Sequence, residues 1–228
     1  MCGKFTAMAS WRKVVRFSQP LEAARDDEIV TYRVAGILPV ILGDPGSGER
    51  RIVPMQWGVP HPREPRRPQP IHARSETVDT TPAFAQAFRE GQRGIVAMRT
   101  FNEGEDIGSK TVQWTVEPGD GVVRGLAFIW RRFEIPGRDT PLLACVLCTV
   151  PASRLIGAIT DRMPAVLDEA DWPAWLGETA APPEAVKALL RTREDSGWRM
   201  TREEKVANPR KKPVDGAKRA APGQPKLL

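Results

Sequence analysis

The sequence of 228 residues lacks the features of several large protein classes. No run of about 18 apolar residues is present and no apolar stretch follows a basic start, so neither membrane insertion nor secretion is expected. Only three cysteines and two histidines occur, which are too few for a metal site and indicate free thiols in a reducing compartment. We therefore expect a cytoplasmic protein that has no membrane contact, no metal ion and no other cofactor.

Composition predicts one folded domain followed by a basic tail. The net charge of +6 lies in residues 199–228, where nine lysines or arginines and three acids leave 25 residues of each sign in the rest of the chain. This segment is poor in aromatic and β-branched residues. We expect a domain over residues 1–196 and a disordered tail over residues 197–228. The tail is either a solubilising segment or an arm that binds phosphates non-specifically.

The pattern of short apolar segments predicts an α+β fold. Runs of β-branched and aromatic residues bounded by Gly, Pro and Asp are typical of strands, and they suggest a mixed or antiparallel sheet. Fewer segments carry helical signals such as Pro or acids at the start and Gly or Arg at the end. Neither an internal repeat nor a regular alternation of strands and helices is visible. The expected strands are 36–42, 93–101, 110–116, 125–130 and 142–150, and the expected helices are 81–91, 167–177 and 182–191.

Two motifs resemble ligand sites but are better explained by the fold. Cys145 and Cys148 form a CxxC motif inside an expected strand, where residues three apart point to opposite faces with Cα atoms about 10 Å apart. We therefore interpret both as buried core thiols. The glycine-rich GDPGSGER at residues 43–50 lacks the Lys and Ser or Thr of a phosphate-binding loop, and we interpret it as a hairpin turn.

Two neighbouring segments are candidates for a binding role. Residues 59–70 contain five prolines and several charges, which is typical of an exposed, stiff loop that either binds a ligand or only connects two elements. Residues 71–77, IHARSET, place Arg74 and Glu76 on one face of an extended segment. An arginine held by a carboxylate is suited to bind phosphate, and a purely structural ion pair is the alternative.

The second residue, Cys2, is the most reactive candidate. Removal of Met1 would leave an α-amine and a thiol on the same residue. Such a 1,2-aminothiol condenses with an aldehyde to an imine, and the thiolate then attacks the imine carbon to close a thiazolidine ring. Because Met1 blocks the amine, this chemistry requires its removal.

Several motifs occur together in one order along the chain. As a set they resemble the SOS-response-associated peptidase (SRAP) family, the abasic-site sensors, from Met1 to about Leu190. The resemblance implies a single α+β domain with a mixed, barrel-like sheet and a few short flanking helices. The motifs are MCGKF (1–5), TYRVAGILPVIL (31–42), MQWGVPHP (55–62), IHARSETV (71–78), IVAMRTFNEGE (95–105) and VPASRLIGAITDRMPAVL (150–167).

The resemblance also implies a function. A monomer binds single-stranded DNA, and Cys2, freed from Met1, forms a thiazolidine with the ring-opened aldehyde of an abasic site. Arg74 matches the arginine that contacts DNA phosphate, and Trp57 with Gly58 matches the segment beside the bound strand. The implied partner is single-stranded DNA with abasic sites, which would bring the protein to the nucleoid. The proteolytic step in the family name is at most the removal of Met1.

The acid–base residues depart from the family pattern. Thr160 stands in place of the catalytic histidine, and Asn102 occupies the position of the glutamate, with Glu103 one residue later. Neither Asn nor Thr titrates near neutral pH. Because a one-residue shift flips every side chain of a strand, Glu103 can enter the site only if a β-bulge is present. The expected catalytic residues are Cys2, Asn102, Glu103 and Thr160.

Two further departures lie in the motifs that carry expected binding residues. Arg33 replaces an assisting asparagine, and His72 replaces the asparagine of an Asn-Ala-Arg motif. Arg33 close to Cys2 would favour the thiolate and would also offer a charge to a phosphate. The expected DNA-binding residues are Arg74, Arg33, Trp57, Gly58 and Glu76.

Three functions are compatible with these residues. The leading hypothesis is an abasic-site processing protein that crosslinks covalently to DNA through Cys2. The second is a non-catalytic relative that binds single strands through Arg74, Trp57, Arg33 and the tail without chemistry. The third is an N-terminal cysteine hydrolase that acts on an amide, for which the sequence identifies no acyl substrate.

Overall fold

The computed structural model describes residues 4–7, 31–44, 47–61, 69–193 and 197–203. Cys2 and most of the proline-rich segment 59–70 lie outside these residues.

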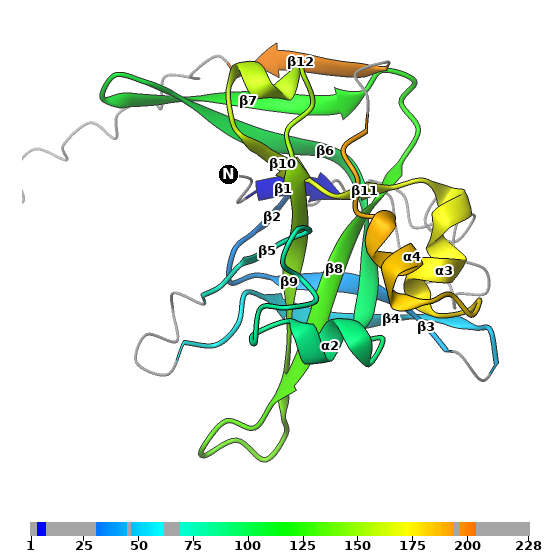
Figure 1. Ribbon diagram of the computed structural model, residues 1–228. Coiled ribbons are helices and arrows are strands. Elements are labelled where there is room, and N and C mark those ends of the chain that lie inside the picture. The colour runs from blue at the N-terminus through cyan, green and yellow to red at the C-terminus, as the bar shows by residue number, and fades with distance from the viewer. Residues whose placement is uncertain (1–3, 8–30, 45–46, 62–68, 194–196, 204–228) are drawn as a thin grey trace, which may run out of the picture.

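Five strands form a closed barrel (Figure 1). Strand β8 (Arg124–Phe133) pairs with β9 (Leu142–Pro151) on one side and with β6 (Arg93–Ile107) on the other. Strand β9 pairs with β4 (Arg50–Trp57), and β4 pairs with β3 (Ile37–Gly43), which returns to β6. The β4–β9 pairing is parallel and the other four are antiparallel. This ring of strands confirms the mixed, barrel-like sheet expected from the sequence.

A second group of strands extends the sheet from β6. Strand β1 (Lys4–Ala7) pairs with one edge of β6 and with β2 (Thr31–Arg33). Strand β7 (Lys110–Pro118) pairs with the other edge of β6, and β12 (Trp198–Arg202) lies along β7 (Figure 1). The first half of β6 therefore belongs to the barrel and the second half to this extension.

Short elements complete the fold. Strand β5 (His72–Arg74) pairs in parallel with β9, β10 (Arg162–Pro164) pairs with β9 in antiparallel fashion, and β11 (Val166–Leu167) pairs with β8. The described part of the chain contains no helix long and apolar enough to cross a membrane. The flanking helices are α2 (Ala85–Arg89), α3 (Trp172–Leu176) and α4 (Pro183–Ala188), with 3₁₀ turns at Ile156–Ala158 and Glu169–Asp171.

The local signals in the sequence predict most of these elements. Each of the five expected strands and three expected helices overlaps an observed one. Gly177 ends α3 at φ 79°, a left-handed conformation that other residues rarely adopt. Strands β3 and β4 pair in antiparallel fashion up to Gly43 and Arg50, and beyond this pair the Asp44 N–H donates to the Glu49 carbonyl oxygen at 2.8 Å. The hairpin interpretation is confirmed.

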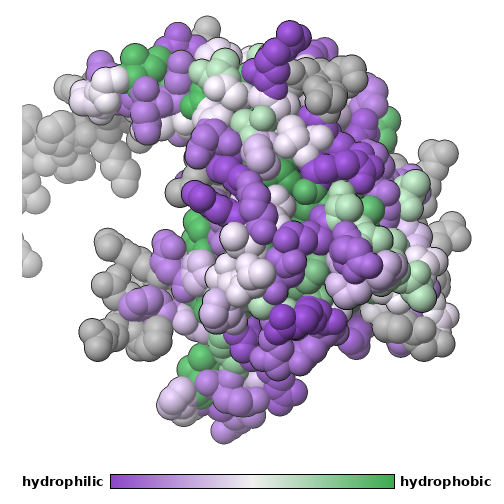
Figure 2. Space-filling view, in the orientation of Figure 1, coloured by the Kyte–Doolittle hydropathy of each residue, from purple (hydrophilic) through white to green (hydrophobic). Residues whose placement is uncertain are grey.

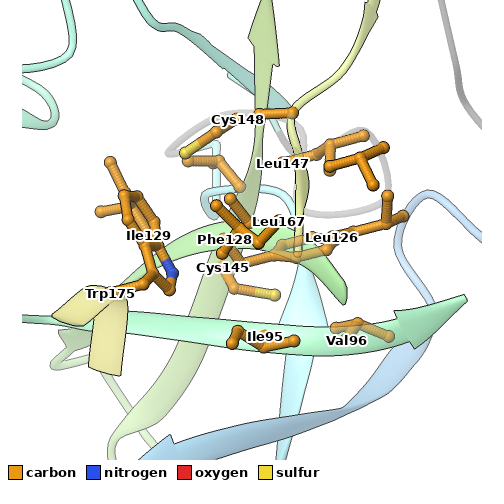
Figure 3. Close-up of a cluster of buried hydrophobic side chains, with 14 of the residues drawn as sticks. Ile95, Val96, Leu126, Phe128, Ile129, Cys145, Leu147, Cys148, Leu167 and Trp175 are labelled. Carbon is orange, nitrogen blue, oxygen red and sulfur yellow. The ribbon is translucent and has the colours of Figure 1, made fainter. Parts of the chain in front are cut away.

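The hydrophobic core of the domain includes both cysteines of the CxxC motif. Cys145 and Cys148 are fully buried on β9 and belong to the cluster of buried side chains drawn in Figure 3. Burial raises the pKa of both thiols well above the ordinary range for cysteine, so both stay protonated. The prediction of core thiols is confirmed.

Strand β12 lies inside the range expected to be tail. It pairs with β7 over its whole length, and the Trp198 ring meets Phe101 edge-on with centroids 5.8 Å apart. Trp198 and Met200 alternate along the strand and pack against the core, which gives this polar segment one apolar face. The fold therefore continues past the expected boundary at residue 197, and the expectation of a disordered tail remains a prediction for residues 204–228.

Gly94 lies in tightly packed surroundings where β3 meets β6 and the barrel closes. A Cβ atom there would overlap Val40 and would lie 2.9 Å from Leu42 Cδ2 and 3.1 Å from the Ile41 carbonyl oxygen. We expect Gly94→Ala to lower the free energy of unfolding by about 1–3 kcal/mol in a urea titration. Gly157→Ala is the matched control, because nothing lies within 4 Å of its added carbon. Equal losses in both variants would contradict this packing.

Candidate functional site

A cavity of about 280 Å³ lies where β5, β6 and β10 approach β9. It combines two carboxylates, two guanidinium groups and one imidazole from separate parts of the chain. The face of the molecule over β5, β9 and β10 is covered mainly by hydrophilic residues with small hydrophobic patches between them (Figure 2). The lining residues are Gln69, Pro70, Ile71, His72, Arg74, Glu103, Thr149, Asp161, Arg162 and Met163.

A β-bulge in β6 precedes the residues that reach the cavity. Thr6 of β1 pairs with Thr100, but the next residue of β1 pairs with Met98. Arg99 is therefore an extra residue in β6, and the sequence of inward and outward side chains changes there. Beyond the bulge, Glu103 lines the cavity and is only 1% exposed. The bulge that Glu103 requires is present.

Asn102 points away from the cavity. Its Nδ2 donates to Glu203 Oε1 at 2.5 Å and to Thr115 Oγ1 at 2.9 Å. Neighbouring residues of a strand point to opposite faces, so Asn102 and Glu103 cannot both enter the same cavity. Asn102 instead joins β6 to β7 and to the residue that follows β12. The structure thus brings Glu103, and not Asn102, to the cavity.

The register of β1 relates the start of the chain to this region. Lys4, two residues after Cys2 in the sequence, pairs with Asn102 on β6 and with Arg33 on β2. Asn102 directly precedes the cavity residue Glu103. Cys2 itself lies outside the described residues.

Glu76 pairs with Arg162 and not with Arg74. Both terminal nitrogens of Arg162 donate to the Glu76 carboxylate, with Nη2 and Oε2 2.9 Å apart, and Nη2 also donates to the Thr149 carbonyl oxygen at 2.7 Å. These hydrogen bonds hold the pKa of Glu76 at about 2, despite an opposing effect of desolvation. The predicted Arg74–Glu76 pair is wrong, because the extended segment ends at Arg74 and a turn follows.

Arg74 is an exposed residue at the mouth of the cavity. None of the ion pairs formed between described residues includes Arg74. Its guanidinium N–H groups can therefore donate to a ligand, because no carboxylate of the described residues forms an ion pair with them. This geometry suits contact with an anionic group such as phosphate.

Trp57 and Gly58 are buried supports. Trp57 is fully buried, its Nε1 donates to the Ile71 carbonyl oxygen at 3.2 Å, and its ring meets His72 edge-on at 6.5 Å. The Gly58 N–H donates to the Cys145 carbonyl oxygen at 2.7 Å. The expectation that Trp57 contacts DNA is wrong, because a tryptophan packed on all sides in the core cannot stack on a base. Trp57 ends β4, an apolar strand of the barrel, and the direction of this strand places the indole in the core.

Thr160 does not line the cavity. Its backbone N–H donates to the Ile156 carbonyl oxygen at 3.1 Å, just after the 3₁₀ turn, and the next two residues, Asp161 and Arg162, reach the cavity instead. Sequence reasoning placed Thr160 at the site and did not place Asp161 or Arg162 there. The strand β10 that begins at Arg162 decides which side chains face β9.

His72 belongs to the cavity although it was not among the expected site residues. It lies two positions before Arg74 on β5, and residues two apart share one face of a strand. That spacing was the available signal in the sequence. It becomes useful only once Arg74 is known to face a cavity.

The Glu76–Arg162 pair predicts a pH dependence of stability. The pKa of Glu76 falls from 4.5 to about 2 on folding, so the carboxylate stabilises the fold fully above pH 4.5 and loses this effect as the pH falls towards 2. We expect Glu76→Gln to lower the free energy of unfolding at pH 7 and to differ less from the wild type at pH 3. Glu134→Gln is the control, because its pair with Arg132 is exposed and contributes little. A stability difference for Glu76→Gln that stays constant between pH 7 and 3 would contradict this role.

Comparisons with known proteins agree with this fold. A family model described as SOS response associated peptidase (SRAP) matches residues 1–209. The abasic site processing proteins YoqW and YobE of Bacillus subtilis strain 168 are each 23% identical over 195 residues, which cover 83% of this chain and 86% and 88% of theirs.

Solved structures show the same fold. A protein from Bordetella bronchiseptica has a TM-score of 0.72 at 18% identity, over 89% of this chain and 100% of its own. A protein from Bacteroides thetaiotaomicron has a TM-score of 0.74 at 16% identity, over 90% of this chain and 93% of its own. With nearly the whole chain matched by the family model, this protein belongs to the SOS response associated peptidase (SRAP) family.

Proposed function

We propose that this protein processes abasic sites in single-stranded DNA and forms a covalent crosslink to them through Cys2 once Met1 is removed. The observation that carries the proposal is the cavity that holds Glu103 and Arg74 next to the strand paired with the N-terminal segment. Two similar Bacillus proteins are named abasic site processing proteins, which supports this substrate class.

The cavity offers separate groups for binding and for chemistry. Arg74 is exposed at its mouth and suits a phosphate of the DNA backbone. Glu103 is buried deeper and suits stabilisation of the positive charge that develops near the reacting carbon. Arg33, whose backbone pairs with Lys4, is a second exposed cation on the side of the N-terminal segment.

The chemistry is a condensation that releases one water molecule. The Cys2 amine adds to the aldehyde carbon of the ring-opened abasic site, and a proton moves from nitrogen to oxygen to give a carbinolamine. Protonation of its hydroxyl expels water and leaves an iminium ion. The Cys2 thiol gives up its proton, the sulfur attacks the iminium carbon, and the electron pair of the C=N bond returns to nitrogen, so that a neutral thiazolidine forms.

The first test is an intact-mass measurement after incubation with a single-stranded abasic oligonucleotide. We expect the wild type to lack Met1 and to gain the oligonucleotide mass minus one water, stable to denaturation. Cys2→Ala should gain no such mass. Loss of Met1 without an adduct would overturn the crosslinking proposal and favour a non-catalytic protein that binds single strands.

Arg74 allows a test of DNA binding that is independent of the crosslink. We expect Arg74→Ala to weaken binding of an intact single strand and to reduce the slope of log K against log salt by about 0.7, the value for one lost phosphate contact. Arg51→Ala is the matched control, because Arg51 is an exposed arginine of β4 that does not line the cavity. Equal effects of the two substitutions would remove Arg74 from the binding site.

A further inference from the structure

We propose that His72 is the proton-transfer residue of this site. The inference rests on the proposed function, because it assigns a role within that reaction. His72 lines the cavity together with Glu103 and Arg74, whereas Thr160 does not line it. The chain therefore has an imidazole at the cavity without a histidine at position 160.

His72 differs chemically from the other ionisable residues of the cavity. Glu103 and Asp161 carry carboxyl groups, and Arg74 and Arg162 carry guanidinium groups. The ordinary pKa of histidine is about 6.5, so imidazole both donates and accepts protons near neutral pH. Among the described lining residues, His72 has the side chain best matched to transfers in both directions.

The fold holds the His72 ring from two sides. Its backbone lies in β5 opposite Leu147 of β9, which fixes the direction of the side chain. Its ring contacts the edge of Trp57, whose indole N–H is in turn bonded to the carbonyl oxygen of Ile71. His72 is half-buried and lines the cavity. A general acid–base residue needs this combination of a fixed position and access to the substrate.

The condensation needs an acid and then a base within one turnover. Protonated His72 donates to the carbinolamine hydroxyl, which leaves as water. Neutral His72 then takes the proton of the Cys2 thiol while the sulfur closes the ring, and the imidazolium is regenerated. The Glu103 side chain, which lines the same cavity, stabilises the positive charge that the iminium and the imidazolium carry in turn.

The test measures single-turnover crosslinking rates of the full chain with a single-stranded abasic oligonucleotide between pH 5 and 8. We expect His72→Asn to slow the reaction by about 100-fold or more at pH 7 and to remove an inflection that the wild type shows in this range. His61→Asn is the matched control, since His61 is the other histidine of the chain and does not line the cavity. The charged groups that line the cavity with His72 are Glu103, Arg74, Asp161 and Arg162, and all remain in both variants.

A second variant separates chemistry from folding. His72→Ala should crosslink slowly, and added imidazole should restore a substantial part of the rate, whereas it should not affect the control. Binding of an intact single strand should remain near the wild-type value, and the variant should still unfold cooperatively, with only the small loss of stability that removal of the ring contact with Trp57 causes. A purely structural role for His72 predicts lost stability without rescue by imidazole.

The outcomes distinguish this inference from the function on which it rests. Wild-type protein that crosslinks, together with a His72→Asn variant of equal rate and pH profile, would overturn the role of His72 and leave the proposed function intact. Absence of rescue in a folded His72→Ala variant would have the same meaning. Wild-type protein that forms no crosslink would overturn both.

Discussion

The site depends on strand β6, because β6 belongs both to the barrel and to the extension of the sheet. Its first half closes the barrel against β8 and β3, and its second half carries the N-terminal strand on one edge and β7 on the other. The extra residue Arg99 lies where these halves meet. By changing which side chains point inward, it turns Glu103 into the cavity and leaves Asn102 to bind the segment after β12. A straight β6 would exchange these two residues.

The walls of the cavity are held by contacts that also belong to the core. Arg162 joins β10 to the turn after β5 through Glu76 and to β9 through Thr149. Trp57 joins β4 to β5 through Ile71. The residues available to a ligand, Arg74 and His72, therefore lie on a short strand that is fastened on both sides. Such a frame limits the motion of the groups that would bind and react, which favours preorganised chemistry.

Local sequence signals predicted the elements more reliably than the contacts between them. Runs such as LLACVLCTV are apolar enough to require a buried strand, and Cys145 and Cys148 accordingly lie in the core. Strand β12 was missed because only Trp198 and Met200 mark it within a basic, polar segment, and its stability comes from pairing with β7. The proposed pair of Arg74 and Glu76 failed for a related reason, since it assumed that the strand continues past Arg74.

The sequence by itself determined the fold class, the strands of the barrel, the hairpin at 43–50 and the family, because these follow from apolar periodicity, turn residues and motif order. Only the tertiary structure decided which polar residues share a cavity. Strand register and residues distant in the chain decide three features: the bulge in β6, the inward orientation of Trp57 and the partner of Glu76. A one-residue change of register alters the direction of every following side chain, and that register is set by packing across the whole sheet.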